Sequence, residues 1–201
     1  MFNWLLLAFF INFSVACSVT IDVGVDGFAR GGQNNILLGK RIWVESNKNA
    51  PNPILDEEVA NKIKRGLELK GYGIASSEAE TDLKLEYVYG IDMGKEVTSS
   101  GTSHQLNVFT GQFDQVTSVS SGTVFTRQLT LRVFDGSDRT KPAWVGEAIS
   151  RGSKSQLRVI IDYLVAAACE HIGQNTSERA PHVYDYPSDP LRLAIPAPAS
   201  K

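Results

Sequence analysis

The sequence predicts an α+β fold, a two-layer sandwich in which two helices pack on one face of a mostly antiparallel sheet. Several segments alternate apolar and polar residues with a period of two, and two segments repeat apolar residues with a helical period. Their order along the chain is strand, strand, helix, three or more strands, helix. Because each helix has one apolar stripe and each strand has one apolar face, covering one sheet face with both helices buries them all.

The predicted strands are the segments with alternating apolar and polar residues, bounded by Gly, Pro, Asn or Asp. They lie at residues 19–25, 40–45, 83–89, 124–134 and 143–149. The last two are joined by the turn residues Asp135 to Asp138, which predicts a hairpin. Trp144 in the final strand is expected to fill core space between the sheet and a helix.

Two amphipathic helices are predicted. The first has Asp56 as its N-cap residue, an apolar residue at every fourth position, and Gly71 as a left-handed C-terminal cap. The second spans about residues 155–172, has a broad apolar face and ends at Gly173. Both helices therefore have one face that requires a partner.

The first sixteen residues have the pattern of a cleavable export signal. An apolar block spans residues 4–13, small residues follow at positions 14 and 16, and Cys17 comes next. The block is shorter than the roughly 20 residues that a membrane-spanning helix requires. No Lys or Arg precedes it, so only the terminal amine is positive. A buried N-terminal strand or helix is the alternative interpretation.

Cys17 directly follows a small residue at the end of this block, which resembles the lipobox of bacterial lipoproteins. The resemblance implies that residues 1–16 are removed as a signal peptide and that Cys17 becomes a lipidated N-terminus. Ser18, rather than Asp, implies an outer-membrane anchor facing the periplasm. Ser14 stands where Leu is usual in that motif. Ordinary signal cleavage at the same bond, without acylation, remains the alternative.

Composition narrows the class of protein. Residues 17–173 are long enough for one domain with a proper core. The net charge of −2, with both signs interspersed, argues against a nucleic-acid partner. The only cysteines are Cys17 and Cys169, too few for a disulfide scaffold or a zinc site. We expect Cys169 to be a small buried residue on the second helix.

Two segments depart from the regular pattern. Residues 94–122 form a polar insertion rich in Gly, Ser, Thr and Gln, which predicts a long hairpin or a mobile loop. Residues 174–201 form a Pro-rich tail with five of the eight prolines, which cannot form a long helix or an inner strand. The apolar tail residues able to dock on the domain are Tyr184, Tyr186, Leu191 and Leu193.

Two parts of the chain resemble a known family. Residues 67–73 and 81–87 are similar to the "L-x-x-K-G-Y … A-D-L-x-V-x-Y" stretch of bacterial lipoproteins in domain-of-unknown-function family 4136. Residues 129–135 and 142–148 are similar to that family's "L-x-V-x-D … x-W-x-G-x-A" segment. The resemblance covers most of residues 19–173. It implies an envelope lipoprotein with no established activity.

The sequence gives no catalytic residue, metal site or cofactor site. The histidines are His104 in the insertion, His171 near the end of the second helix and His182 in the tail, and none has metal-ligand spacing with another ligand. His171 is explained by the helix dipole. Asp135 and Asp138 lack the spacing of a calcium loop, so a turn is the better interpretation.

Three hypotheses for function follow. The first is a non-catalytic, lipid-anchored envelope protein that binds another protein or stabilises an assembly, with the insertion and tail as binding surface. The second is an envelope carrier for a small apolar or lipidic ligand held between helices and sheet. An enzyme is the third, because catalytic residues can assemble from distant positions. A membrane partner through lipid on Cys17 is common to the first two.

Overall fold

The computed structural model describes residues 19–32, 39–47, 50–106, 111–135, 138 and 140–193. The predicted signal peptide and Cys17 lie outside these residues. In chain order the elements are β1 (Val19–Ala29), η1 (Arg30–Gly32), β2 (Arg41–Val44), α1 (Pro53–Leu69), β3 (Gly73–Ile74), η2 (Glu78–Glu80), β4 (Leu83–Ile91), β5 (Lys95–Leu106), β6 (Phe113–Asp135), β7 (Trp144–Gly152), α2 (Leu157–Glu170), β8 (Ala180–Tyr186) and α3 (Pro190–Leu193).

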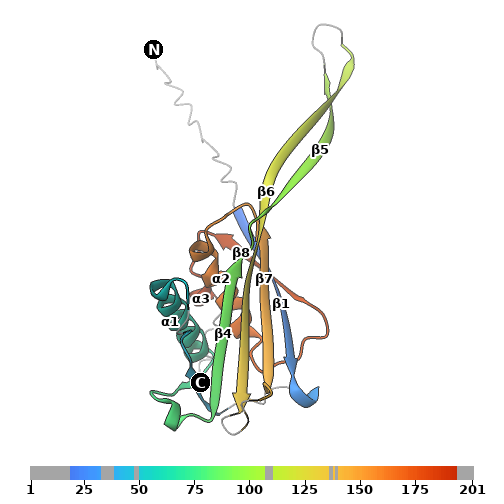
Figure 1. Ribbon diagram of the computed structural model, residues 1–201. Helices are drawn as coiled ribbons and strands as arrows, with labels where there is room; N and C mark the ends of the chain where they lie inside the picture. Colours follow the sequence, from blue (N-terminus) through green and yellow to red (C-terminus); the bar gives the residue numbers. More distant parts are fainter. Residues whose placement is uncertain are drawn as a thin grey trace, which may run out of the picture.

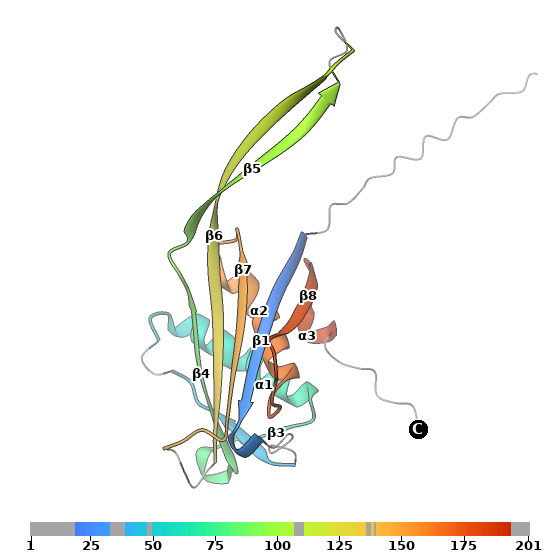
Figure 2. The ribbon, with the colours of Figure 1, turned by 90° about the vertical axis from the view of Figure 1, so that its right-hand side faces the viewer.

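One mixed sheet of eight strands organises the molecule. Seven strands follow the order β3-β2-β4-β6-β7-β1-β8, and β5 pairs with β6 off this path. Most pairings are antiparallel, and only the two pairings made by β2 are parallel. Both α1 and α2 cover the same face of the sheet (Figure 1; Figure 2). The predicted α+β sandwich with two helices on one face is therefore confirmed.

The first helix begins earlier than predicted. Asn52 is its N-cap, and the Asn52 side chain accepts a hydrogen bond from the backbone N–H of Leu55 at 3.1 Å. Pro53 follows at the first helical position, where its missing N–H is not needed. The prediction of Asp56 as N-cap is wrong, because Asp56 lies inside the first turn and is only 3% exposed. The predicted end is confirmed, since Gly71 has φ +84° just past the helix.

The second helix is the centre of the core. It spans Leu157–Glu170, close to the predicted range, and packs against α1, β1, β6 and β7. Cys169 is buried on this helix, as predicted. A Cβ on Gly66 of α1 would lie 2.8 Å from the Cys169 Sγ, so glycine allows the close approach of the two helices. Trp144 is fully buried, and its indole N–H donates to the Gln174 carbonyl at 2.8 Å.

Part of the Pro-rich tail completes the sheet. β8 pairs antiparallel with β1 from Val19↔Tyr186 to Val25↔Ala180, and it is an edge strand, as its proline content requires. Tyr184 and Leu191 are buried in the core, which confirms that these two residues dock the tail. The folded unit therefore continues past Gly173 through β8 and α3.

The polar insertion forms a long hairpin, which was one of the two predicted alternatives. β5 and residues 113–124 of β6 leave the sheet and project far beyond the rest of the molecule (Figure 1; Figure 2). We call this two-stranded segment the arm. Every residue of β5 is exposed, so β5 buries no side chain in the hydrophobic core. It is the feature of the fold that the sheet and helices do not explain.

Candidate functional site

The arm is a long ribbon with hydroxyl side chains on both faces. Its register runs over twelve cross-strand pairs, from Lys95↔Val124 to Leu106↔Phe113. At about 3.4 Å per residue, this length corresponds to about 40 Å. The side-chain hydroxyls of Ser99 and Ser120 form a hydrogen bond across the ribbon, with 2.8 Å between the two Oγ atoms. An isolated two-stranded hairpin is only marginally stable in water, so the arm lacks what normally stabilises such a structure.

A β-bulge sets the direction of the arm. β4 pairs with β6 up to Ile91↔Arg127, and β5 resumes at Lys95↔Val124. Between these two pairs, residues 92–94 lie opposite residues 125 and 126 of β6. The chain between β4 and β5 therefore has one extra residue, which defines a β-bulge. Bulges bend a strand and increase its twist, so the arm leaves the sheet at a defined angle.

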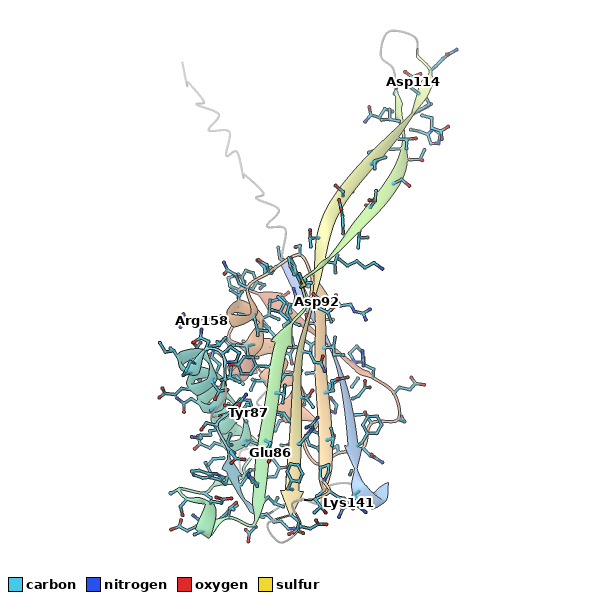
Figure 3. All side chains as sticks on the ribbon, in the orientation of Figure 1. Glu86, Tyr87, Asp92, Asp114, Lys141 and Arg158 are labelled. Atoms are coloured by element: carbon cyan, nitrogen blue, oxygen red, sulfur yellow. The ribbon has the colours of Figure 1, made fainter. Side chains whose placement is uncertain are left out.

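Asp92 and Gly94 hold this bulge in place. The Asp92 carboxylate accepts hydrogen bonds from the backbone N–H of Thr126 at 2.9 Å and of Gly94 at 3.0 Å. The Thr126 backbone hydrogen bond is the main cause that lowers the Asp92 pKa from its ordinary value. Gly94 has φ +81°, and a Cβ there would lie 2.6 Å from the Thr123 Cγ2. Figure 3 shows Asp92 at the base of the arm and Asp114 near its far end.

The arm exposes apolar side chains at both ends. At its base, Met93 is 99% exposed and Ile91 is 36% exposed. At its far end, the cross-strand neighbours Leu106 and Phe113 are 54% and 71% exposed. Val97, Val116 and Val119 add further exposed apolar surface along its length. Exposed apolar side chains are therefore distributed along the whole arm, from its base to its far end.

One edge of the arm is continuous with an open edge of the sheet. β2 pairs with β4 only as far as Val44↔Leu85, and the Glu45 N–H donates to the Leu85 carbonyl at 2.9 Å. Beyond this point, none of the described strands pairs with the outer edge of β4 or β5, from Glu86 to Leu106. This edge contains no proline, and Lys95 is its one basic residue apart from His104. The unpaired backbone groups of this edge are a template for another strand, interrupted by the bulge at residues 92–94 and by Lys95.

A hollow and a buried polar cluster both lie near this edge. The hollow has a volume of about 310 Å³ and is lined by Glu45, Ser46, Asn47, Glu86, Tyr87, Val88, Thr130 and Arg132. In the cluster, the Asp56 Oδ2 accepts hydrogen bonds from the Tyr87 hydroxyl at 2.8 Å and from the Asn47 N–H at 3.0 Å. Burial raises the Tyr87 pKa above its ordinary value, and the Asp56 hydrogen bond adds to this. The cluster fastens the loop after β2 to α1 and β4, which is a structural role.

The structure brings two of the three histidines together. His171 Nε2 and His182 Nε2 lie 2.9 Å apart, and the Glu170 Oε2 lies 3.5 Å from the His182 Nδ1. Burial, followed by the neighbouring His182, lowers the His171 pKa. Sequence spacing offered no sign of this pair, because it forms only when β8 docks beside the end of α2. His104 lies elsewhere, on the exposed β5 strand.

The histidine geometry is that of a hydrogen bond. The ring centroids are 5.0 Å apart, so the rings point almost directly at one another. A metal bound to both nitrogens at about 2.0–2.1 Å would require each ring to turn away from this line. Among the described residues, no group of three or more His, Cys, Asp or Glu side chains is arranged to hold a metal ion. Within those same residues, no helix has the length and apolar character needed to cross a membrane.

No protein-family model and no curated protein matches the chain. Among solved structures, a PDZ domain protein from Parabacteroides distasonis is similar to 83% of this chain with 12% identity and a TM-score of 0.53. This chain covers 39% of that protein's chain. Two structures of a PelC dodecamer from Paraburkholderia phytofirmans are also similar, and one of them is of a variant with a single substitution. In both, the match covers 77% of this chain and 99% of the PelC chain. Their identities are 14% and 13%, with TM-scores of 0.45 and 0.43. The first similarity concerns the fold alone.

Proposed function

We propose that this chain is a non-catalytic, lipid-anchored protein of the cell envelope that binds another protein chain through its arm. The anchor rests on Cys17 at the end of the signal-like block and on the lipoprotein resemblance of residues 67–73 and 81–87. The binding role rests on one observation: the arm, about 40 Å of paired strand, packs against nothing in the described part of the chain.

The energetics of the arm favour a partner. Ordering a residue costs about 1–2 kcal/mol of backbone entropy, and a ribbon without a buried face recovers little of this from apolar burial. An additional strand on the free β5 edge would satisfy the exposed backbone groups and cover side chains such as Leu106 and Phe113. This is β-strand addition, a common mode of protein recognition. The partner therefore presents an extended segment.

The position of the arm relates it to the proposed anchor. The first described residue, Val19, lies at the end of the sheet from which the arm projects (Figure 1; Figure 2). Cys17 precedes Val19 by two residues, a span of at most about 7 Å. A lipid on Cys17 would hold this end of the sheet at the membrane surface. The partner is accordingly expected at the same membrane.

Site-specific cross-linking in cells tests the binding role. A photoreactive side chain at Ser103 or Thr117 of the arm should give cross-linked products, because both positions are exposed on the ribbon. The matched control is Glu68, which is exposed on α1. Equal cross-linking from Glu68 and from the arm positions would contradict the proposal.

A shortened arm provides the second part of the test. Val97 and Gly122 are directly paired, so replacing residues 98–121 with Asn-Gly should close the ribbon with a two-residue turn and keep the register. This variant should fold like the parent by circular dichroism and lose its protein partner. If the partner were retained, the arm would not be the binding element.

The anchor has its own test. Intact mass of the chain extracted from membranes should correspond to residues 17–201 plus acyl groups. Cys17→Ser should release the protein into the soluble envelope fraction. A product that retains Met1 and is soluble without this substitution would contradict the anchor.

A further inference from the structure

We propose that the partner of the arm is a second copy of this chain, and that the two β5 strands pair antiparallel about a two-fold axis at Ser100. This inference rests on the proposed function and names the partner that the arm binds. A two-fold contact must be self-complementary: if one residue contacts a second residue of the other copy, that second residue contacts the first in turn. The sequence of β5 can be tested against this requirement directly.

The polar side chains of β5 select one register. A two-fold axis perpendicular to the ribbon keeps each face on its own side, so residues of like parity meet. With Ser100 on the axis, Glu96 lies opposite His104 of the other copy, and Lys95 lies opposite Gln105. No two like charges face one another. Moving the axis to Ser99 or Gly101 places Glu96 opposite Thr102 or Leu106 and loses the pair.

The remaining positions fit the same register. Thr98 lies opposite Thr102 of the other copy, and cross-strand threonine pairs are favourable. The regular pairing ends at Lys95 and Gln105, because Gly94 belongs to the bulge at the base of the arm and not to β5. The apolar far end of each arm then lies beside the base of the other, which carries the exposed side chains of Ile91 and Met93. The pattern of apolar ends and a hydroxyl-rich middle is thus matched to its own reverse.

Length and shape allow this contact. Pairing residues 95–105 of two copies would form about ten backbone hydrogen bonds, as many as a typical whole interface makes. The result is a four-stranded ribbon in place of two isolated two-stranded hairpins, which are marginally stable on their own. Because the arm projects beyond the sheet and helices (Figure 2), antiparallel pairing places the sheet and helices of the two copies at opposite ends of the ribbon.

The other edge of the arm is a weaker candidate. Residues 113–123 of β6 carry a single charged residue, Asp114, and offer no opposite charge to it in an antiparallel self-pairing. The β5 edge is also continuous with the unpaired edge of β4, which lengthens the available template.

Thiol cross-linking of the full chain in detergent tests the register. Ser100→Cys should give a covalent dimer on oxidation or with a short thiol-to-thiol cross-linker. The matched control is Val119→Cys, which is exposed, lies directly opposite Ser100 within one arm, and is on the strand that does not pair. It should dimerise no more than the unsubstituted chain. Burial raises the Cys169 pKa to about 12, so this thiol does not interfere.

A charge swap tests the complementarity separately. Glu96→Lys should weaken the dimer about two- to thirty-fold, measured by sedimentation equilibrium, because the two cross-strand Glu96–His104 pairs are lost. Adding His104→Glu to this variant should restore the parent value. Restoration is a readout that a purely local structural effect would not give.

The outcomes separate the two proposals. Equal cross-linking of Ser100→Cys and Val119→Cys, or a monodisperse monomer at every concentration tested, would overturn the two-copy inference. If Ser103 or Thr117 cross-linked to a different protein and not to a second copy, the binding function would stand and only the identity of the partner would change. If the arm gave no cross-links of any kind in cells, the binding function itself would be refuted.

Discussion

Replacing Tyr87 with Phe removes a hydroxyl that donates to the buried Asp56 carboxylate at 2.8 Å, and it leaves the ring in place. Asp56 is 3% exposed, and its Oδ1 makes no hydrogen bond. The remaining partner of the carboxylate is the Asn47 N–H at 3.0 Å. A hydrogen bond to a charged group contributes about 1.5–3 kcal/mol, so the expected loss of unfolding free energy lies in the upper part of that range.

Urea unfolding followed by circular dichroism measures this loss. Tyr89→Phe is the matched control, because Tyr89 lies on the same face of β4 and its ring stacks on Tyr87. We expect Tyr89→Phe to change the free energy of unfolding by less than about 0.5 kcal/mol. The slope of free energy against urea should be unchanged in both variants.

A third substitution distinguishes the two possible roles of Asp56. Serine is a good N-cap residue, so Asp56→Ser would preserve stability if Asp56 capped the helix. If Asp56 is instead a buried hydrogen-bond acceptor, the same substitution should lower the free energy of unfolding by about 1–3 kcal/mol. Asn52→Ala, which removes the observed cap, should cost about 1 kcal/mol. Full stability of Asp56→Ser, or a Tyr87→Phe value equal to that of Tyr89→Phe, would refute the buried-acceptor role.

Three other predictions concern the histidine pair, the bulge and the core. Because the His171 pKa is lowered in the fold, mainly by burial and then by His182, the unfolded chain binds more protons as pH falls below about 6.5. Stability should therefore be constant above that pH and decrease below it in urea titrations, and His171→Gln should flatten the decrease; a flat profile in the parent would contradict this. Gly94→Ala should change the direction of the arm, read as altered spin-label distances between the arm and α1, and should lower the free energy of unfolding by about 1–2 kcal/mol, because Ala is strained at φ +81°. Trp144→Phe should cost about 1–3 kcal/mol through the lost hydrogen bond to the Gln174 carbonyl and an unfilled volume, and an unchanged urea midpoint would show that this contact is unimportant.

The periodic patterns of the sequence were sufficient to predict most strands and both long helices outside the arm. Alternation placed β1, β4 and β7, and the four-residue repeat placed α1, because each element buries one face and the pattern is a direct consequence of that burial. The strand order was not accessible in this way. The parallel pairing of β2 with β4 and the pairing of β8 with β1 depend on contacts between distant segments, and no local pattern encodes them.

The N-cap error shows how local signals compete. Asp56 followed by two glutamates is a good helix start by composition, but Asn52-Pro53 is a better one, and the longer helix leaves Asp56 facing inward. Tyr87 and the loop after β2 then supply its hydrogen bonds. The deciding partner is thirty-one residues away in the sequence, so a reading confined to one segment could not find it.

The arm could be predicted only in part, for a reason that bears on its role. A strand that buries one face against its own domain has to alternate apolar and polar residues, and β5 does not, which is why the sequence left a hairpin and a loop equally open. Because β5 has no one-sided pattern, its sequence does not show which of its faces another surface would cover. β5 does carry Glu96 and His104 at equal distances from Ser100, and a bulge at its base sets its direction. These are properties of a free strand edge rather than of a buried face, and the proposed pairing with a second chain rests on them.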